Sequence, residues 1–372
     1  MKKRLSFILA LLLAATLFPL SAFAESSLSR SETYVNPLYR DIISEDDIRS
    51  AKKRVDKLYS SEADEYVEGL DAGAAVMREA MERRETDITV KVVTDDDGAL
   101  EIIPVLALEE TGVPTQGDYL RWTYGGWEAE QSGYVSGGMY YLSITYTVTY
   151  YTTAQQEAEL GAKIDTVLSG FGFDDASSDY EKICAVYDYI CANVSYDYTT
   201  PGTFKHTAYA AMMNGRAVCQ GYATLLYRML MQLGISCRLI PGNNHAWNIV
   251  ELNGLYYNVD STWDAGSAPE YYRYFLRSDE TFYNHPREAE YKTAAFYAKY
   301  PMSASDFVFV TGDLNSDGAL DARDLVRLKK FVAGAAVSLA VSGDLNSDGC
   351  INAIDLIRLQ KILTRTDASD VR

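Results

Sequence analysis

The chain has 372 residues, and its formal net charge of −18 comes from 52 acidic against 34 basic side chains. This length predicts two or three domains. The acidic balance argues against nucleic acid as a partner, because no basic surface is left to neutralise phosphates.

The first 24 residues, MKKRLSFILALLLAATLFPLSAFA, place three basic residues before an apolar stretch that ends in a small-residue site at 22–24. This order predicts a secretory signal peptide cut after Ala24, and therefore a secreted, extracellular protein. The alternative is an uncleaved membrane anchor. The apolar run is short for that, and no other stretch approaches the length of a membrane span, so we expect none.

The odd number of cysteines argues against a disulfide framework, because at least one thiol is unpaired or pairs with another chain. Cys184 and Cys191 lie on one predicted helix at a separation of roughly 10 Å, which is too far for a bridge. The five cysteines are Cys184, Cys191, Cys219, Cys237 and Cys350.

Residues 25–153 are predicted to form an accessory α+β region without site chemistry. Residues 25–85 look helical after a polar start, with Ser44 as an N-cap candidate in front of acidic residues. Residues 86–153 turn to β-branched and aromatic runs, DITVKVVT and MYYLSITYTVTYYTT, which predict strands.

Residues 154–301 change character and predict helices followed by strands. Ser178 and Glu181 have the spacing of a capping box at the start of a helix. Further helices are predicted over 207–214 and 219–233, the second ending at Gly234. Strands follow in CRLIPG, HAWNIVEL and LYYNVD. The apolar face predicted for the first helix comprises Ile183, Val186, Tyr187, Ile190 and Val194.

Cys219, in the stretch GRAVCQGYATLL, is a candidate nucleophile. By itself the stretch also fits a core thiol or one half of a disulfide. A nucleophilic cysteine needs a base and a group that orients the base. Cys219 falls in the first turn of its predicted helix, where the helix dipole favours the thiolate.

The candidate base and its orienting carboxylate come from one predicted hairpin. The Asn-Gly pair at 253–254 is the favoured two-residue type I′ turn. The register it sets places Asp260 opposite Trp247 and His245 opposite Thr262, all on one face. His245 and Asp260 then become diagonal neighbours within hydrogen-bond reach. A surface His–Asp pair is the alternative; with Cys219 upstream, the arrangement favours catalysis.

The segments GRAVCQGYA, NHAWNIV and YYNVDSTWD resemble the three motifs of the transglutaminase-like core, a papain-like cysteine fold, over roughly residues 179–264. The resemblance implies that Cys219 is the nucleophile, His245 the general base and acid, and Asp260 the orienting residue. The family includes amide hydrolases, crosslinking enzymes and inactive copies.

The oxyanion donors are predicted less sharply than the triad. The backbone N–H of Cys219 is one candidate, and an upstream side chain, Tyr209 or His206, is another. His285 precedes a proline outside any motif, and we expect it to be structural or exposed.

The C-terminal segment repeats with a period of 31 residues: GDLNSDGALDARDL at 312–325 and GDLNSDGCINAIDL at 343–356. Each copy places oxygen side chains at loop positions 1, 3, 5, 9 and 12 and glycine at position 6, a pattern that predicts one Ca²⁺ per loop, two in all. Ala319 and Cys350, at position 7, would contribute backbone carbonyls. The side-chain ligands are Asp313, Asn315, Asp317, Asp321 and Asp324 in the first loop and Asp344, Asn346, Asp348, Asn352 and Asp355 in the second.

This segment resembles a type I dockerin domain, in which two calcium loop–helix units each end on Asp at position 12. The resemblance implies docking onto a cohesin module of a scaffoldin in a cellulosome-type assembly. It also implies that loop positions 10 and 11 help to choose the partner. These positions are Ala322 and Arg323 in the first copy and Ala353 and Ile354 in the second.

The sequence thus predicts an α+β protein. Its parts are the accessory α+β region, a transglutaminase-like, papain-like core over 154–301, a linker over 302–311, and a small all-α calcium-binding dockerin over 312–366. Calcium serves the dockerin rather than the active site.

The predicted activity is acyl transfer from an amide of a protein or peptide substrate, by hydrolysis or by crosslinking, with hydrolysis preferred. One alternative is an inactive binding or structural module. The other is a carbohydrate-degrading component in polysaccharide catabolism, although no pair of carboxylates in the core is marked as a glycosidase acid and nucleophile.

Overall fold

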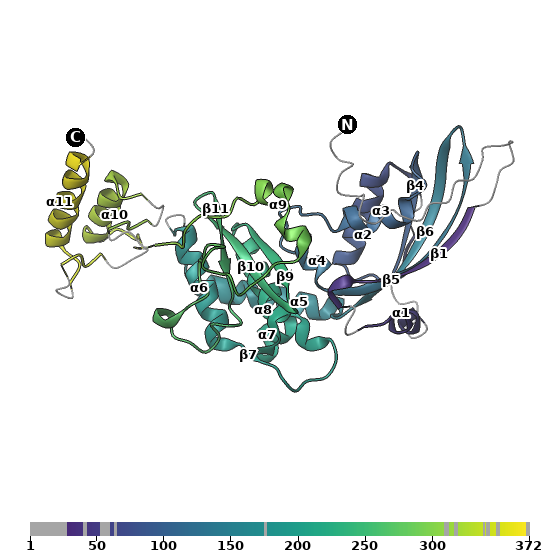
Figure 1. Ribbon diagram of the computed structural model, residues 1–372, viewed down its shortest axis with the longest axis horizontal. Coiled ribbons are helices and arrows are strands. Elements are labelled where there is room, and N and C mark those ends of the chain that lie inside the picture. Colours follow the sequence, from purple (N-terminus) through teal and green to yellow (C-terminus); the bar gives the residue numbers. More distant parts are fainter. Residues whose placement is uncertain are drawn as a thin grey trace.

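A computed structural model describes residues 28–39, 43–52, 60–62, 65–174, 177–308, 312–315, 319–337, 339, 343–346 and 350–369. The predicted signal peptide (1–24) and the predicted ligands Asp317 and Asp348 lie outside these residues. Figure 1 shows three parts along the long axis: an N-terminal sheet with helices, a central α+β core, and a pair of C-terminal helices.

The N-terminal part is built on a sheet with the strand order β1-β5-β6-β4-β2, and β3 also pairs with β4. Side chains along β4 alternate between half-buried and buried, the period-two pattern of a strand with one face in a core. Helices α2 (Leu70–Glu82) and α3 (Ala99–Ala107) share that core with β4 and β6. The strands are β1 (Leu28–Val35), β2 (Ser60–Glu62), β3 (Val67–Glu68), β4 (Asp87–Thr94), β5 (Tyr124–Ser136) and β6 (Met139–Tyr150).

The predicted secondary structure of this part is wrong in two places, although its α+β character is confirmed. The segment 25–85 was expected to be helical, yet it contains β1, β2 and β3 beside helices α1 (Glu45–Lys52) and α2. β1 is a largely polar edge strand, so its pairing with the distant β5 leaves little local signal. Helices α3 and α4 (Asp118–Arg121) interrupt the segment in which strands were expected.

The helices of the core follow the predicted pattern. Helix α6 (Asp179–Asn193) begins at a capping box in which the side chains of Ser178 and Glu181 each accept the other's backbone N–H. Helix α8 (Cys219–Gln232) is buried along most of its length and stops before Gly234, whose φ is 79°. The predicted apolar face of α6 is buried: Ile183, Val186, Tyr187, Ile190 and Val194. The other two helices of this group are α5 (Ala154–Gly170) and α7 (Ala208–Asn214).

The core sheet has three antiparallel strands in the order β11-β10-β9. Asn253 and Gly254, between β10 and β11, have φ values of 57° and 79°, as the predicted type I′ turn requires. The predicted register is confirmed as far as the pair Asn248–Val259. The strands are β9 (Cys237–Gly242), β10 (His245–Leu252) and β11 (Leu255–Val259).

Beyond Val259 the predicted ladder is wrong, because the chain leaves the strand at Asp260. The backbone N–H of Asp260 donates to the carbonyl of Tyr274 at 2.8 Å instead of pairing with Trp247. Its carboxylate accepts the backbone N–H groups of the next turn, a local bond that favours a bend over a strand.

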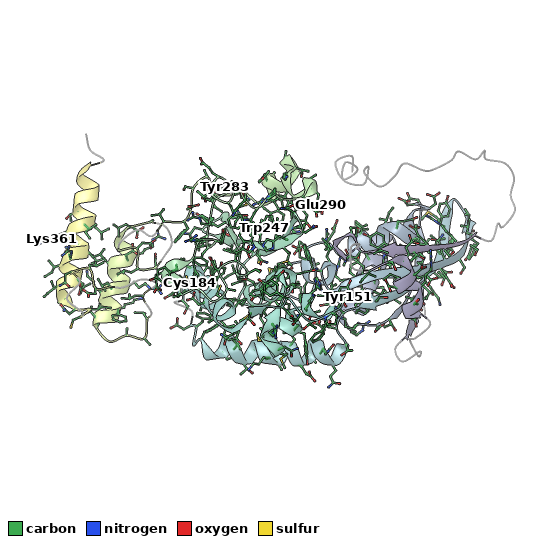
Figure 2. The ribbon with its side chains drawn as sticks, turned by 60° about the horizontal axis from the view of Figure 1, so that its bottom comes forward. Tyr151, Cys184, Trp247, Tyr283, Glu290 and Lys361 are labelled. Atoms are coloured by element: carbon green, nitrogen blue, oxygen red, sulfur yellow. The ribbon has the colours of Figure 1, made fainter. Side chains whose placement is uncertain are left out.

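The two faces of the core sheet pack against different partners. One face lies against α8, and the side-chain amide of Asn248 donates to the carbonyl of Ala223 on that helix at 3.0 Å. The other face carries Ile240, Trp247 and Ile249 and is covered by the returning chain, including Phe282 and Phe296. Helix α9 (Ala294–Lys299) belongs to this cover. In Figure 2, Trp247 lies inside the core.

A buried ion pair joins the N-terminal part to the core. The guanidinium of Arg238, on β9, donates to both carboxylate oxygens of Asp118, on α4, at 2.6 and 2.9 Å. Asp118 also accepts the backbone N–H of Leu239 at 2.9 Å. Glu110 lies 3.4 Å from the same guanidinium. Arg238 is therefore bonded to one acid and close to a second, and the charge of Arg121 also acts on Asp118.

The C-terminal part contains helices α10 (Ala322–Val332) and α11 (Ala353–Ser369). Their small core is formed by Leu314, Leu328, Leu345 and Leu359. Arg327 of α10 lies 3.5 Å from Glu181 of α6, which links this part to the core. Across the residues that the structure describes, no helix has both the length and the apolar character needed to cross a membrane.

We predict that Arg238→Leu lowers the free energy of unfolding by about 3–5 kcal/mol, because it leaves two buried carboxylates without their cation. Burial raises the pKa of Asp118, but Arg238 outweighs it and holds the value below its ordinary range. Burial and the charge of Asp118 raise the pKa of Glu110 to about 7. In the variant both pKa values are raised, so stability falls as the pH increases, and the loss is greater at pH 8 than at pH 5.

Urea unfolding at both pH values measures this loss. Arg83→Leu is the matched control, because Arg83 is half exposed and pairs with Glu85 at the surface. The control should change stability by less than about 1 kcal/mol. An Arg238→Leu loss no larger than that of the control would contradict the role of this ion pair.

Candidate functional site

Cys219 is the first residue of α8, as predicted, and its thiol is partly exposed. Two glycines of the GRAVCQGYA segment position it. Gly215 ends α7 in the left-handed conformation, with φ of 62°. A Cβ at Gly221 would lie 2.6 Å from the Ala217 side chain and 2.9 Å from the Thr207 carbonyl, so the start of α8 can approach this backbone only with glycine.

His245 and Asp260 are brought together as the hairpin argument predicts. His245 Nε2 lies 2.7 Å from Asp260 Oδ2. Asp260 is 1% exposed, and its Oδ1 accepts the backbone N–H groups of Thr262 at 2.9 Å and Trp263 at 3.3 Å. The carboxylate is thus held by its own turn on one oxygen and faces the imidazole with the other.

The thiol of Cys219 completes a line of three groups. Burial lowers the pKa of His245, but hydrogen bonds with Asp260 and Cys219, together with their charges, raise it to about 10. For Asp260, burial raises the pKa, but the two imidazoles outweigh it and keep the pKa below its ordinary value. The geometry therefore favours a charged imidazolium between the sulfur of Cys219 and the carboxylate of Asp260.

His285, expected to be structural or exposed, is not exposed: its side chain has 0% exposure. Its Nε2 lies 2.9 Å from Asp260 Oδ2, the same oxygen that faces His245. His285 follows β11 by many residues and belongs to no motif, so no spacing signal could have paired it with Asp260. The only hint was that the chain has three histidines in all.

His245, Asp260 and His285 also form a group whose ligand atoms lie within 4.8 Å of one another, close enough to consider a metal ion. Two ligands on a tetrahedral zinc ion, each at about 2.1 Å from the metal, are about 3.4 Å apart. The Nε2–Oδ2 distances of 2.7 and 2.9 Å are instead hydrogen-bond lengths. The arrangement fits a proton network better than a metal site.

The two side chains predicted as oxyanion donors make other contacts. The Tyr209 hydroxyl donates to Glu159 at 2.7 Å, and His206 Nδ1 lies 2.9 Å from the side-chain oxygen of Gln220. A different hydroxyl reaches the backbone of the cysteine: Tyr196 accepts a hydrogen bond from the backbone N–H of Cys219. The sequence analysis missed this residue, because its position depends on the parallel pair β7 (Ser195–Tyr196) and β8 (Arg216–Ala217).

A hollow of about 640 Å³ lies beside the site. Its wall includes Trp263, whose ring centroid is 5.2 Å from that of His245, so the hollow and the line of three groups are adjacent. Trp263 is 45% exposed and Tyr271 69% exposed, which offers aromatic surface to a ligand. The lining residues are Trp263, Asp264, Ser267, Tyr271, Arg273 and Tyr274.

Three other cysteines are in surroundings that disfavour a thiolate. Burial raises the pKa of Cys184 to about 12, and it raises the pKa values of Cys191 and Cys237 further. Cys350 is exposed, in the second calcium loop. All five cysteines are free thiols in the structure.

The described parts of the two predicted calcium loops fit a cation. In the first, Asp324 Oδ1 accepts the backbone N–H of Leu314 at 2.8 Å, and Oδ2 accepts that of Asp321 at 2.8 Å. The second loop repeats these bonds through Asp355. Burial and the nearby charge of Asp313 raise the pKa of Asp324, and a bound cation would relieve that repulsion. The remaining described ligand positions of the loops are Asn315, Ala319, Asp344, Asn346, Cys350 and Asn352.

All four positions predicted to choose the partner are exposed: Ala322, Arg323, Ala353 and Ile354. The face of α11 is the more apolar one, with Ile354 at 55% and Ile357 at 54% exposure beside Arg358 and Lys361. Figure 2 shows Lys361 at the end of the molecule that is farthest from the N-terminal sheet.

Comparison with protein families agrees with this geometry. Residues 172–272 match the model of the transglutaminase-like superfamily, and residues 311–364 match that of the dockerin type I domain. Both resemblances drawn from the sequence are therefore confirmed. The chain carries a transglutaminase-like domain followed by a type I dockerin domain.

Curated relatives match only a part of this chain. The kyphoscoliosis peptidase of Mus musculus is 29% identical over 136 residues, which is 30% of this chain and 21% of the relative. That of Homo sapiens is 30% identical over 111 residues, 25% of this chain and 17% of the relative. The chain thus spans about a fifth of the length of the curated relatives it matches.

A solved structure entitled "Crystal structure of a TGase" is 16% identical to this chain and has a TM-score of 0.27. The match covers 57% of this chain and 63% of that one.

We predict that Asp260→Asn returns His245 toward the ordinary imidazole pKa, because the substitution removes the negative charge that stabilises the imidazolium. In the wild type the imidazolium should persist up to about pH 10, the raised value of its pKa. NMR titration of protein with labelled histidines measures this directly, since there are only three rings to assign.

His206 is the internal control. Burial lowers its pKa, and its partner is Gln220 rather than Asp260, so Asp260→Asn should leave its titration unchanged. A His245 titration that is the same in both proteins would show that Asp260 does not set its charge.

Proposed function

We propose that the central domain is a cysteine-dependent enzyme that transfers the acyl group of an amide, with Cys219, His245 and Asp260 as its catalytic residues. The observation that carries the proposal is the 2.7 Å bond between His245 and buried Asp260, together with the thiol of Cys219 acting on the same imidazole. A partly exposed thiol at a helix N-terminus is suited to attack a substrate, whereas the buried cysteines are not.

In the first half of the reaction, Cys219 Sγ attacks the amide carbonyl carbon while its proton is held on His245. The tetrahedral intermediate collapses as the C–N bond breaks, and His245 returns the proton to the departing amine. The enzyme is left as a thioester. In the second half, water attacks the thioester while His245 takes its proton, and the acid and the free thiol are released.

The backbone N–H of Cys219 and the hydroxyl of Tyr196 are the proposed oxyanion donors. They already bind each other, so the arriving carbonyl oxygen would replace that bond and accept from both groups. Two donors placed in advance reduce the reorganisation needed when negative charge develops on the oxygen.

Hydrolysis is the preferred outcome over crosslinking to a lysine amine. The relatives named peptidase support this preference. The proposed substrate is a protein or peptide, because the exposed aromatic side chains of Trp263 and Tyr271 in the adjacent hollow suit an extended chain with apolar side chains.

The C-terminal part is proposed to hold two Ca²⁺ ions and to dock the enzyme onto a cohesin of an extracellular, cellulosome-type scaffold. Each ion would be held by the loop oxygens, Asp313 to Asp324 in the first copy and Asp344 to Asp355 in the second. We assign docking to α11 rather than α10, because Arg327 of α10 already faces Glu181, whereas Ile354 and Ile357 are exposed. Basic Arg358 and Lys361 suit an acidic partner surface.

We predict that Cys219→Ala abolishes both cleavage and amine incorporation in a peptide-library screen, a loss of at least about 10³-fold. Cys184→Ala and Cys237→Ala are matched controls, since burial leaves both thiols protonated, and they should keep activity when folded. Circular dichroism confirms the fold of each variant. Turnover by Cys219→Ala at the wild-type rate would exclude this mechanism.

We predict that calorimetric titration of the full chain detects about two Ca²⁺ ions, and that chelation removes cohesin binding but leaves alkylation of Cys219 unchanged. Few apolar residues hold the C-terminal part together, so metal binding should supply much of its folding free energy. Asp313→Ala with Asp324→Ala should weaken the whole segment.

Glu79→Ala, an exposed acid of α2, controls for loss of charge alone. Absence of any calcium-dependent heat or change in helicity at millimolar calcium would contradict the assignment of the loops.

A further inference from the structure

Asp260 has one more side-chain partner than a Cys-His-Asp arrangement needs. His285 Nε2 approaches Asp260 Oδ2 at 2.9 Å, while His245 Nε2 approaches the same oxygen at 2.7 Å. The other oxygen is already occupied by two backbone N–H groups. The other ring nitrogen of His285, Nδ1, lies 2.8 Å from the side-chain oxygen of Asn284, so both nitrogens of the second imidazole have a partner.

The surroundings of His285 are aromatic, which makes a polar ring costly there unless it is hydrogen-bonded. The ring of Phe282 stacks on it with centroids 3.9 Å apart, Trp263 lies at 4.3 Å and Trp247 at 5.1 Å. A phenyl ring would fill the same space. Packing therefore does not explain the imidazole, whereas its bonds to Asp260 and Asn284 do.

The backbone holds this ring independently of Asp260. Glu288 donates its backbone N–H to the carbonyl of Pro241 at 3.0 Å, and Arg287 reaches Asn258 at 2.9 Å. A Cβ at Gly242 would lie 2.0 Å from the Pro286 carbonyl oxygen, so this close approach requires glycine. The segment that presents His285 to Asp260 is thus fastened to both β9 and β11.

We propose that His285 is a positioning residue of the active site: its Nε2–H donates to Asp260 Oδ2 and keeps that oxygen aimed at His245. The proposal rests on the proposed function, because His285 acts on Cys219 only through Asp260 and His245. It also extends the site beyond residues 172–272, where the match to the transglutaminase-like superfamily ends.

The mechanism follows from the number of donors. With Oδ1 held by the turn and Oδ2 held by His285, the carboxylate cannot rotate away when His245 becomes neutral during the reaction. Without His285, His245 would be the one remaining partner of Oδ2. The orientation of Oδ2 would then depend on the same bond through which it is meant to orient His245. We therefore expect Asp260 to stabilise the imidazolium of His245 less well when His285 is absent.

Few other titratable groups can mask this effect. Burial raises the pKa of each tyrosine and cysteine that senses the charge of Asp260, so these groups stay neutral below pH 9. Among the described residues, Asp264 is the one further acid that senses the charge of Asp260. The neutral groups are Tyr187, Cys191, Tyr196 and Tyr222.

The test measures the rate at which iodoacetamide alkylates Cys219 from pH 5 to pH 11, read by mass spectrometry of the Cys219 peptide so that exposed Cys350 does not interfere. His285→Phe keeps an aromatic ring in the cage but removes the donor. We expect a loss of about tenfold at pH 7, and the rise of the rate with pH should move about one pH unit higher, because a less stabilised imidazolium favours the thiolate less.

His285→Gln, whose amide N–H can replace Nε2–H, should stay within about threefold of the wild type and keep its pH profile. Tyr283→Phe, an exposed neighbour in the same segment, is the matched control and should change nothing. A purely structural role would leave the pH profile of a folded His285→Phe unchanged, and that result would overturn the proposal.

If His285→Phe does not fold, NMR of the wild type decides instead. The His285 ring should carry a proton on Nε2, and its resonances should shift in Asp260→Asn. An Nε2 without a proton, or zinc bound at this cluster in the purified protein, would overturn the proposal.

The outcomes also separate this proposal from the function on which it rests. A wild-type thiol that reacts no faster than that of His245→Ala shows that Cys219 is not activated, and both ideas then fail. An activated wild-type thiol with an unaffected His285→Phe removes the role of His285 alone.

Discussion

The proposed active site depends on one buried charge, the carboxylate of Asp260. A carboxylate with 1% exposure is costly unless donors replace its lost water. The chain supplies four: two backbone N–H groups from the turn at 262–263 and two imidazoles. This need explains why β11 ends at Val259, why the chain turns there, and why a later segment returns across the sheet. The geometry of the site therefore follows from the need to replace the water lost around a single buried acid.

Other buried carboxylates of the structure are also held by hydrogen-bond donors, but the donor groups differ. Asp118 is neutralised by Arg238 and a backbone N–H, and Asp324 and Asp355 accept backbone N–H groups that close the proposed calcium loops. An arginine stays charged at all accessible pH values, and a backbone N–H does not titrate. Around Asp260 two of the donors are imidazoles, a group that can pass protons during a reaction. The described acids are thus held by fixed donors at the junctions and by imidazoles at the proposed catalytic centre.

Local patterns accounted for the features that depend on neighbours in sequence. The capping box at Ser178, the helix that begins at Cys219, and the hairpin around 253–254 were all predictable, because each is set within a few residues. β1 was not, since a polar edge strand acquires its structure from β5. Neither was His285, whose place beside Asp260 follows from contacts of the segment 278–288 with β9 and β11. The partner of a buried charge is a tertiary property, and periodicity does not report it.

The two domains also differ in what holds them together. The central domain has a large apolar core of its own, in which α6, α8 and the sheet share buried side chains. The C-terminal part has four buried leucines and two acidic loops, so its stability rests mainly on neutralising those acids. Catalysis and docking should therefore respond to different variables, proton concentration in one case and calcium in the other. Since Arg327 and Glu181 form the described ion pair between α10 and α6, loss of calcium removes the proposed docking surface without requiring any change around Asp260.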